Sequence, residues 1–321
     1  MSIAETLVQN LRHLAQRTGL ARASSYRLFD IELKQRIPLS PSLARFVFTG
    51  PEVARMCTMA PDQRVKLLFP SADGLPPQLP HEGDWLKTRR ALEAEHRPPM
   101  RTYTIRALRR EALEVDVDFV LHGETGPAST WATHARPGDR LQMVAPDGEF
   151  PGTPGGYEWR PPEGIRHVLL IGDETALPAI AGILEELAIW PDRPNAQAFI
   201  EVPHETDRLE LRCAPEAQVN WLPRDSGGWR HGQGMIRAAK ELATLPEARQ
   251  QPGKPQKIKE VDIDTQILWD LARPADNGFY AWVAGESAAV MAIRRHWVGE
   301  LGMDRRALSF MGYWRLGRAL D

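Results

Sequence analysis

In the first half of the chain, apolar residues recur at about every second position. Between about Tyr26 and Phe150, apolar and polar residues alternate in short runs such as RVKLLF, RTYTIRA, LEVDVDFVL and DRLQMVAP, with Pro, Gly and Asp turns between them. This alternation predicts short half-buried strands, as in an antiparallel barrel or sandwich. In LEVDVDFVL we expect the leucine, valine and phenylalanine side chains to be buried and Glu114, Asp116 and Asp118 to face solvent.

The second half of the chain shows strand and helix patterns in turn. HVLLIG (167–172) is a continuous apolar run, as expected of a strand buried on both faces, and the segment after it carries Leu177, Ile180, Leu184 and Leu187 at helical spacing. Further strand patterns occur in AQAFIEV, VNWLPR and YAWVAGE, and helix patterns follow the last two. Repeated strand and helix units predict a doubly wound α/β domain around a parallel sheet.

Three other stretches complete the outline. Leucine and isoleucine at helical spacing before Gly19 predict an amphipathic N-terminal helix, and Pro and Gly clusters between Pro151 and Gly164 predict a domain boundary. Residues 245–277 are polar, and we expect a surface excursion of low functional weight. The predicted division is a helical extension over 1–24, a β-barrel domain over 25–155 and an α/β domain over 156–321.

Composition and charge narrow the chemistry. The 321 residues carry 40 basic and 42 acidic side chains, so no excess positive field favours nucleic acid as a partner. The first residues contain no unbroken apolar run, so we expect no signal peptide, no membrane span and a cytoplasmic location. Only Cys57 and Cys213 occur, far apart, which argues against iron–sulfur clusters, structural zinc and disulfides. Any redox chemistry would therefore use a bound organic cofactor.

The strand RTYTIR places a cation and an aromatic ring on one face. Arg101 and Tyr103 share that face with Ile105, because side chains alternate along a strand. Such a pair can hold a phosphate and stack on a flat ring, as a flavin dinucleotide requires. A cation–π pair on a sheet surface is the ordinary alternative, and this hexapeptide alone does not decide between them.

A turn of small residues, HGETGPASTWA (122–132), leads into the next predicted helix. The helix begins near Pro127, and its first N–H groups have no intrahelical acceptor, while the Ser129 and Thr130 hydroxyls lie beside them. A pyrophosphate can bind at such a helix N-terminus. A plainly capped helix explains the same residues equally well.

Two turns follow strands of the predicted parallel sheet at its carboxyl edge, where α/β sheets bind nucleotides. GDETALPA (172–179) lacks the GxGxxG pattern, and Asp173 and Glu174 could cap the helix, hold a ribose or be solvated. The second turn, VAGE (283–286), either lines a nucleotide site or is an ordinary connection. At the chain end, GYWRLG includes Trp314, whose ring either covers a cofactor or docks the tail.

Taken in order, these segments resemble the siderophore-interacting protein family, FAD-dependent ferric-siderophore reductases of the ferredoxin-reductase-like group. The resemblance covers about residues 25–318. The segments that carry it are RVKLLFP (64–70), RTYTIR (101–106), HGETGPASTWA (122–132), PGDRL (137–141), GDETALPAI (172–180), VAGE (283–286) and GYWRLG (312–317). It implies an antiparallel six-stranded FAD-binding barrel followed by a parallel-sheet nucleotide-binding domain.

The resemblance also implies site residues. The residues expected to bind FAD are Arg101, Tyr103, Thr104, His122, Gly126, Ala128, Ser129 and Trp314, with Tyr103 near the isoalloxazine and residues 126–129 at the pyrophosphate. The residues expected to line the nicotinamide site are Asp173, Glu174, Thr175 and Ala176. Family members release Fe(II) from siderophores, whose hard ligands hold Fe(III) more tightly, so no protein ligand to iron is expected.

An anionic ferric chelate needs cations near the flavin. Arg64 and Lys66 project from one face of a strand, and we favour Lys66, with Arg140 in the PGDRL turn as a second candidate. Solvated surface side chains are the ordinary alternative for these cations. The family often has Gly-Pro-Arg-Gly after PGD, but residues 145–148 are Ala-Pro-Asp-Gly here, so one expected cation is absent.

The resulting hypothesis is a cytoplasmic ferric-siderophore reductase with FAD and either NADPH or NADH. Arg208 and Arg212 favour a 2'-phosphate and hence NADPH, whereas Glu201, at the end of the second strand, could bind a ribose hydroxyl instead. A flavin or ferredoxin-type reductase with another acceptor is one alternative. A siderophore-binding carrier without catalysis is the other.

Overall fold

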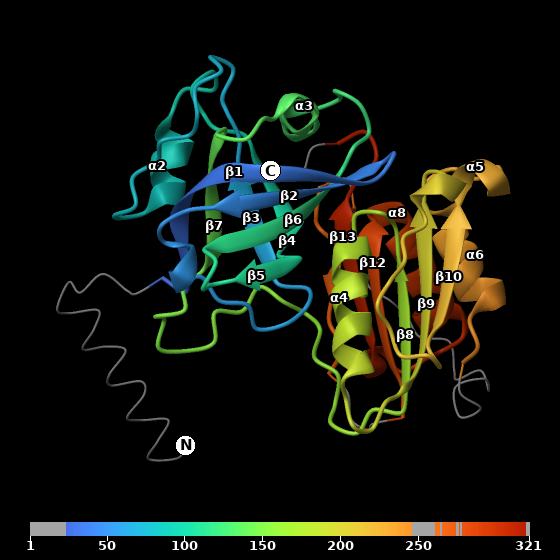
Figure 1. Ribbon diagram of the computed structural model, residues 1–321. Helices are drawn as coiled ribbons and strands as arrows, with labels where there is room; N and C mark the ends of the chain where they lie inside the picture. Colours follow the sequence, from blue (N-terminus) through green and yellow to red (C-terminus); the bar gives the residue numbers. More distant parts are fainter. Residues whose placement is uncertain (1–23, 246–260, 264, 274–275, 277, 319–321) are drawn as a thin grey trace.

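The computed structural model describes residues 24–245, 261–263, 265–273, 276 and 278–318, and it contains two β-sheets side by side (Figure 1). The helix expected near the N-terminus falls in residues 1–23, outside the described residues. The predicted fold class, an antiparallel barrel-like sheet followed by an α/β unit, is confirmed.

The first sheet is antiparallel throughout and has seven strands in the order β4-β3-β7-β1-β2-β6-β5. Its strands are β1 (Tyr26–Ser40), β2 (Leu43–Thr49), β3 (Arg64–Leu68), β4 (Met100–Thr104), β5 (Ala107–Arg109), β6 (Glu114–Val120) and β7 (Arg140–Pro146). The strand count exceeds the predicted six because of the three-residue β5. Helix α2 (Trp85–Ala91) lies in the connection from β3 to β4, and α3 (Pro127–His134) in the connection from β6 to β7.

The outer face of β6 differs from the prediction. Val115, Val117 and Phe119 are buried as expected, but Asp116 is buried as well. Its carboxylate accepts two hydrogen bonds from the guanidinium of Arg109, at 2.8 and 2.5 Å. Alternation therefore predicted the direction of the side chains correctly, whereas the expected solvent exposure was wrong because arginines cover this face.

The second sheet has six strands in the order β10-β9-β8-β12-β13-β11. They are β8 (His167–Gly172), β9 (Asn195–Val202), β10 (Gln218–Pro223), β11 (Trp269–Asp270), β12 (Tyr280–Glu286) and β13 (Leu308–Trp314). Five strands are parallel, and the two-residue β11 pairs antiparallel with β13. The helices are α4 (Leu177–Ala188), α5 (Arg224–Gly227), α6 (Gln233–Arg237) and α8 (Ser287–Arg294), with π-helical turns at Ala238–Leu242 and Arg295–Glu300 and 3-10 turns at Val53–Arg55, Glu205–Asp207 and Arg305–Ala307.

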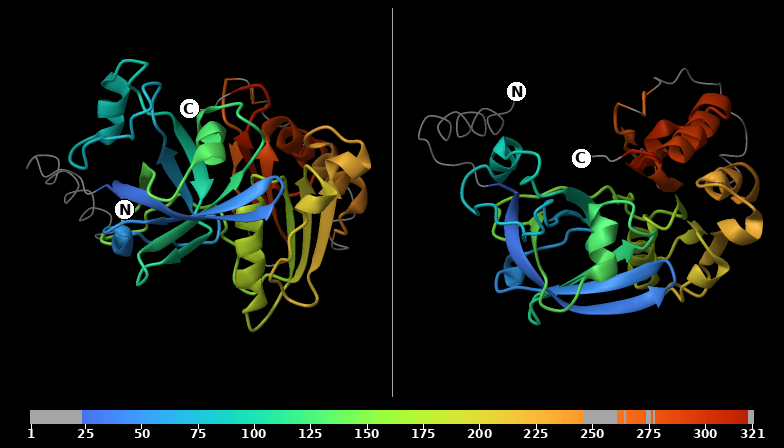
Figure 2. Two further views of the ribbon diagram at one scale, coloured as in Figure 1. Left: turned by 45° about the horizontal axis from the view of Figure 1, so that its top comes forward. Right: turned by 90° about the horizontal axis from the view of Figure 1, so that it is seen from above.

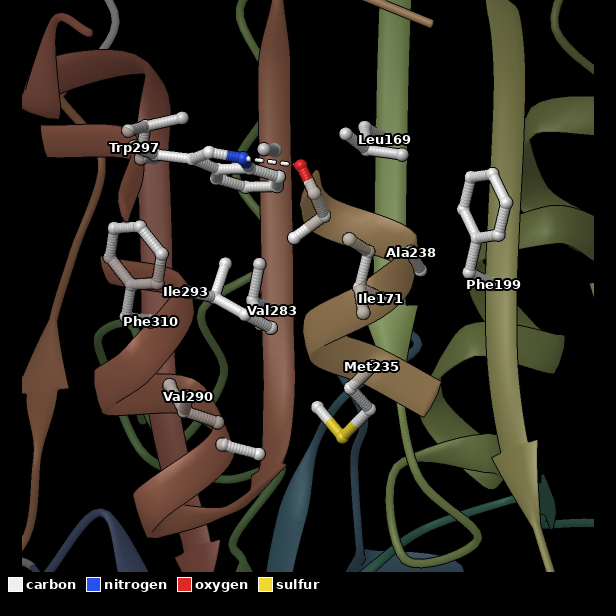
Figure 3. Packing of buried hydrophobic residues seen from close by; sticks show 14 of the residues in the cluster. Leu169, Ile171, Phe199, Met235, Ala238, Val283, Val290, Ile293, Trp297 and Phe310 are labelled. Atoms are coloured by element: carbon white, nitrogen blue, oxygen red, sulfur yellow. Dashed lines mark hydrogen bonds between the residues drawn. The ribbon is translucent and has the colours of Figure 1, made fainter. Parts of the chain in front are cut away.

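Helices cover both faces of the second sheet. The predicted apolar stripe of α4 is buried on one face, which confirms that pattern. On the other face, α6 and α8 pack on the strands, as Figure 3 shows for Met235 beside Ile171 and for Ile293 beside Val283. The indole N–H of Trp297 donates to the carbonyl of Ala239 at 3.0 Å, so the largest side chain in this layer keeps its polar atom paired.

Two polar contacts join the sheets. The β1–β2 hairpin extends to the second sheet (Figure 2), where the fully buried carboxylate of Asp207 accepts hydrogen bonds from the Ser40 hydroxyl at 2.6 Å and the Ser42 N–H at 2.9 Å. Arg106, which follows β4, makes a two-pronged contact with Glu185 of α4 at 3.0 and 2.5 Å. Hydrogen bonds to the buried carboxylate of Asp207 and the ion pair of Arg106 with Glu185 therefore set the relative position of the two sheets.

The segment between the sheets is fixed by a third contact. Asp62 accepts hydrogen bonds from the N–H groups of Glu158 and Trp159 at 2.7 and 2.9 Å. Glu158 in turn accepts from Arg64 at 2.8 Å and from the Trp269 indole at 3.1 Å. Trp269 belongs to the stretch in which we expected a surface excursion, and its half-buried place at this junction contradicts that expectation for this residue.

Four buried polar atoms at this junction have no hydrogen-bond partner among the described residues. They are Asp62 Oδ1, Arg64 Nη1, Trp282 Nε1 and Tyr313 Oη. Burial raises the pKa of Asp62 to about 6, against the opposing effect of the two N–H donors and of the Arg64 charge. The native protein therefore binds a proton at Asp62 more tightly than the unfolded chain does.

This pKa gives a pH dependence of stability with a defined sign. The contribution of Asp62 is complete below about pH 4 and is lost as the pH rises through about 6, and a shift of about two units corresponds to about 3 kcal/mol. In Asp62→Asn the side chain stays neutral and keeps an acceptor. We expect the free energy of unfolding of the variant, relative to the native protein, to rise by about 3 kcal/mol between pH 4 and pH 7 in urea titrations.

The exposed Asp192 provides the control, since Asp192→Asn changes the same charge away from the junction. We expect no such pH-dependent difference in that variant. A difference between Asp62→Asn and the native protein that stays constant with pH would contradict the assignment.

Candidate functional site

The RTYT strand β4 lies at the edge of the first sheet. Tyr103 is half-buried, and its ring centroid is 4.3 Å from that of Phe119. Arg101 lies on the same face and donates to the carbonyl of Met100 at 2.8 Å. Thr104 is buried and lies opposite Arg64 in the β3–β4 register. The predicted cation and aromatic ring therefore share one face of an edge strand.

Helix α3 begins next to this aromatic face. The ring centroid of Trp131 in this helix is 6.0 Å from that of Phe119, whose ring also contacts Tyr103. At the N-terminus, the Ser129 hydroxyl accepts from the Gly126 N–H at 3.2 Å and donates to the Gly126 carbonyl at 3.0 Å. Ala128 and Ser129 lie in the first turn, where helical geometry gives their N–H groups no intrahelical acceptor. The exposed His122 bonds to the Thr125 hydroxyl at 2.8 Å in the preceding turn.

Cations gather on the other face of the β3–β4 pair. Lys66 lies opposite Thr102, to whose hydroxyl its Nζ donates at 3.1 Å, whereas Val65 lies opposite Tyr103. Burial lowers the pKa of Lys66, and the guanidinium groups of Arg64 and Arg89 lower it further. In the part of the chain that the structure describes, no carboxylate lies within ion-pair distance of Lys66.

Arg140 does not join this group. It is exposed at the start of β7, where its Nε lies 3.6 Å from a carboxylate oxygen of Glu32. Lys66 pairs with Val144 on the same strand, four residues further along, a separation of about 13 Å. Arg64 differs again, because Glu158 neutralises it and its guanidinium stacks 4.3 Å from the Trp269 ring. Lys66 is thus the predicted cation with the least compensated charge.

At the carboxyl edge of the second sheet, Asp173 forms the centre of a hydrogen-bond network. The carboxylate is buried, and it accepts from the Thr175 N–H at 3.0 Å and the Thr175 hydroxyl at 2.5 Å. It also accepts from the Glu286 N–H and from the Trp314 indole, both at 2.8 Å. Burial, and secondarily the charge of Glu174, raise the pKa of Asp173 to about 7. Ala176 is buried at the start of α4.

Glu174 belongs to a buried ion triad. Both of its carboxylate oxygens accept from Arg224 at 2.8 Å, and Arg224 also contacts Glu201 at 3.2 Å. Glu201 is fully buried and accepts from the N–H groups of Gly232 and Met235 at 2.7 and 3.1 Å. The alternative in which Glu201 binds a ribose hydroxyl is therefore wrong for this structure, because its carboxylate is enclosed and occupied.

The terminal segment GYWRLG docks on the same network. Besides the indole bond to Asp173, the Trp314 carbonyl accepts from the Ser287 hydroxyl at 2.8 Å. Arg315 donates to Glu286 at 2.8 Å, and the Leu316 N–H donates to the same carboxylate at 3.2 Å. Of the two roles weighed for Trp314, docking of the tail is the one these contacts describe.

Sequence reasoning missed Arg224 and took Glu286 only as part of a turn. A signal for Arg224 was present, because it directly follows the apolar strand VNWLP at the edge where ligands bind. Glu286 ends YAWVAGE, and its carboxylate caps α8 by accepting from the N–H groups of Ala288 and Ala289 at 2.7 and 3.0 Å. Glu201 and Glu286, which lie at strand ends, thus stabilise helix N-termini of the fold itself.

Comparisons with known proteins agree with this arrangement. Residues 32–150 match the siderophore-interacting FAD-binding domain, and residues 165–317 match the siderophore-interacting protein model. An uncharacterized protein of Mycobacterium tuberculosis is 32% identical over 286 residues, 87% of each chain. The chain belongs to the siderophore-interacting protein family.

Two further relatives carry functional descriptions. The ferric vibriobactin reductase ViuB of Vibrio cholerae is 27% identical over 293 residues, which cover 91% of this chain and 90% of ViuB. The crystal structure of a siderophore utilization protein from T. fusca superposes with a TM-score of 0.69 at 27% identity, covering 92% of this chain and 96% of that one.

The family's FAD-binding domain can be tested against the residues present. A flavin dinucleotide requires an aromatic or apolar surface for its ring and N–H donors for its pyrophosphate. The half-buried Tyr103 and the first turn of α3 supply these on neighbouring elements that share Phe119. The donor set therefore fits FAD.

Two absences complete the description of the site. Over the described ranges, no helix is both long enough and apolar enough to cross a membrane. Among the same residues, no three His, Cys, Asp or Glu side chains are grouped so that they could hold a metal ion.

The Asp173 network leaves no room for a side chain at Gly285. Its φ is 148°, and a Cβ there would lie 2.5 Å from Oδ2 of Asp173. In Gly285→Ala the backbone is strained and the carboxylate is pushed from the Glu286 and Trp314 donors. We expect the free energy of unfolding to fall by about 3 kcal/mol, measured by chemical denaturation.

Gly74→Ala is the matched control. Gly74 also has a positive φ, 76°, but a Cβ there meets no atom within 4 Å. Backbone strain alone should lower the free energy of unfolding by about 1 kcal/mol. Equal losses in the two variants would show that the contact with Asp173 is unimportant.

Proposed function

We propose that this protein is an NAD(P)H-dependent, FAD-containing ferric-siderophore reductase. In this proposal residues 25–155 bind FAD and residues 156–321 bind the nicotinamide nucleotide. The family assignment, the likeness to ViuB and the fit of Tyr103 and α3 to a flavin support it. Bound FAD would supply the conversion of one hydride into two single electrons.

The observation that carries the substrate assignment is the environment of Lys66. Its ammonium group is partly desolvated beside two guanidiniums, and it donates a hydrogen bond to the Thr102 hydroxyl rather than to a carboxylate. An anion stabilises a partly desolvated cation, because it replaces the interactions with water that the cation has lost. Many ferric chelates carry the negative charge that such a site requires.

The edge position of β4 connects Lys66 with the flavin side. Lys66 and Tyr103 lie on opposite faces of the β3–β4 pair, but β4 has a sheet partner on one side only. A chelate docked at the open edge of β4 can therefore approach both faces. We propose that Lys66 orients the chelate there, while Arg101, Tyr103 and Thr104 hold the flavin.

The net reaction converts NAD(P)H and two Fe(III) into NAD(P)⁺, two Fe(II) and a proton. Fe(II) leaves because the hard oxygen ligands of siderophores hold it far less tightly than Fe(III). We place this reaction in the cytoplasm, where reduced nicotinamide nucleotides are found. An unpaired His, Asp or Cys ligand for iron is not needed, since the chelator carries the metal.

Charge removal at Lys66 tests the substrate site. In Lys66→Gln we expect the KM for an anionic ferric tris-catecholate to rise about tenfold, equivalent to about 1.4 kcal/mol of binding free energy, with kcat little changed. The KM for a neutral ferric trihydroxamate should change much less. Fe(II) formation with NAD(P)H under anaerobic conditions, followed with a chromogenic Fe(II) chelator, gives both constants.

Lys34→Gln serves as control, because Lys34 is an exposed lysine of β1 whose charge is paired with Glu114 of β6. It should leave both KM values unchanged. If Lys66→Gln affects the neutral and anionic chelates equally, Lys66 does not recognise charge. If free flavins or ferredoxin reoxidise the protein faster than any ferric chelate, the physiological acceptor is a different one.

A further inference from the structure

A pocket of about 430 Å³ opens at the carboxyl edge of the second sheet. It lies beyond the ends of β10 and β12, and its lining includes the three arginines Arg224, Arg230 and Arg315. Its volume falls in the range typical of small-ligand sites. Three cations around one pocket indicate a ligand with several negative charges.

Carboxylates of the chain occupy the N-termini of α6 and α8 at this edge. Asp173 accepts from the Thr175 N–H before α4, Glu201 from N–H groups at the start of α6, and Glu286 from those of α8. In many dinucleotide folds a phosphate occupies such a position. Here the first N–H groups of α6 and α8 are bound by carboxylates of the chain itself, which repel a phosphate. Any phosphate in this pocket must therefore be bound by side-chain cations.

Two of the three arginines are already neutralised. Arg224 contacts Glu174 and Glu201, and both carboxylates are buried. Arg315 contacts Glu286 at 2.8 Å. Arg230 is exposed at the pocket, and its guanidinium makes no ion pair with any residue that the structure describes. An additional negative charge in the pocket would therefore be met by Arg230.

The residues first considered for nucleotide selection lie elsewhere. Arg208 pairs with Glu205 at 2.7 Å on the surface, and neither it nor the exposed Arg212 lines the pocket. Glu201, at the strand end where NAD-specific folds place the ribose acceptor, is buried under Arg224. The pocket thus contains a cation, Arg230, that can bind a 2'-phosphate. The carboxylate of Glu201, which could have accepted a hydrogen bond from a free 2'-hydroxyl, is not accessible there.

We propose that this pocket binds the phosphates of a pyridine dinucleotide and that Arg230 selects NADPH over NADH by contacting the 2'-phosphate. The inference rests on the proposed function, since it assumes a nicotinamide nucleotide as electron donor. Arg230 follows β10, the edge strand of the sheet, while Arg315 follows β13 on the other side of β8. A dinucleotide lying across the strand ends would place its two halves toward these two sides.

Direct binding of oxidised nucleotides tests the assignment without turnover. Calorimetric titration of the FAD-loaded protein with NADP⁺ and NAD⁺ should give at least about tenfold tighter binding of NADP⁺, which corresponds to about 1.4 kcal/mol. The fragments 2',5'-ADP and 5'-AMP should show the same order. In Arg230→Ala the preference should disappear through weaker NADP⁺ binding, while NAD⁺ binding stays the same.

Arg230→Lys and Arg208→Ala complete the design. The lysine variant keeps a positive charge and should retain part of the preference, and Arg208→Ala should retain all of it. Equal or tighter binding of NAD⁺ to the native protein, or an unchanged preference in a folded Arg230→Ala, would overturn the role of Arg230 alone. If neither dinucleotide binds to the native protein, the nicotinamide donor of the proposed function fails together with this inference.

Discussion

The buried carboxylate of Asp173 sets the shape of the edge where the parallel strands end. A desolvated carboxylate is costly unless hydrogen-bond donors surround it. Its donors come from three separate segments: Thr175 after β8, Glu286 after β12 and Trp314 at the end of β13. These segments must therefore approach one another for the charge to be satisfied, and Gly285 lacks a side chain where the carboxylate needs the space.

The other charged side chains around this network are also satisfied by groups of the protein itself. Glu201 and Glu286 satisfy helix N-termini, and the triad of Glu174, Arg224 and Glu201 is closed on itself. Because most charges here are paired within the protein, the few cations without a carboxylate partner are the candidates for binding an anionic ligand. On the first sheet, Lys66 is partly desolvated and has no carboxylate within ion-pair distance among the described residues. At the edge of the second sheet, Arg230 is the arginine of the pocket lining that makes no ion pair with a described residue. Each sits in the half of the molecule where the proposed reaction requires an anion.

Much of the fold was accessible from the sequence because local periodicity reports burial directly. HVLLIG and the stripe of α4 were placed correctly, since a buried parallel strand and an amphipathic helix leave clear patterns. Asp116 was misjudged because its partner Arg109 comes from a neighbouring strand, and pairing across strands leaves no periodic signal. The small helix α2 was not anticipated, as its polar sequence differs little from a loop.

The site was predictable to the extent that it follows strand ends. Asp173, Glu174 and Thr175 were predicted as site residues because they follow the first parallel strand. The partners Arg224 and Trp314 could not be predicted, because they lie about 50 and 140 residues away along the chain. The closed state of Glu201 required knowledge of Arg224 and of the α6 backbone. Local sequence shows which residues reach an edge, whereas the three-dimensional contacts decide which charges stay available.

The most direct test of the account is an anaerobic two-step experiment on the FAD-loaded protein. Addition of NAD(P)H should bleach the flavin absorbance, and subsequent addition of a ferric siderophore should restore it with two Fe(II) formed per nucleotide oxidised. A purified protein that does not retain FAD, or a bound flavin that NAD(P)H leaves oxidised, would contradict the account.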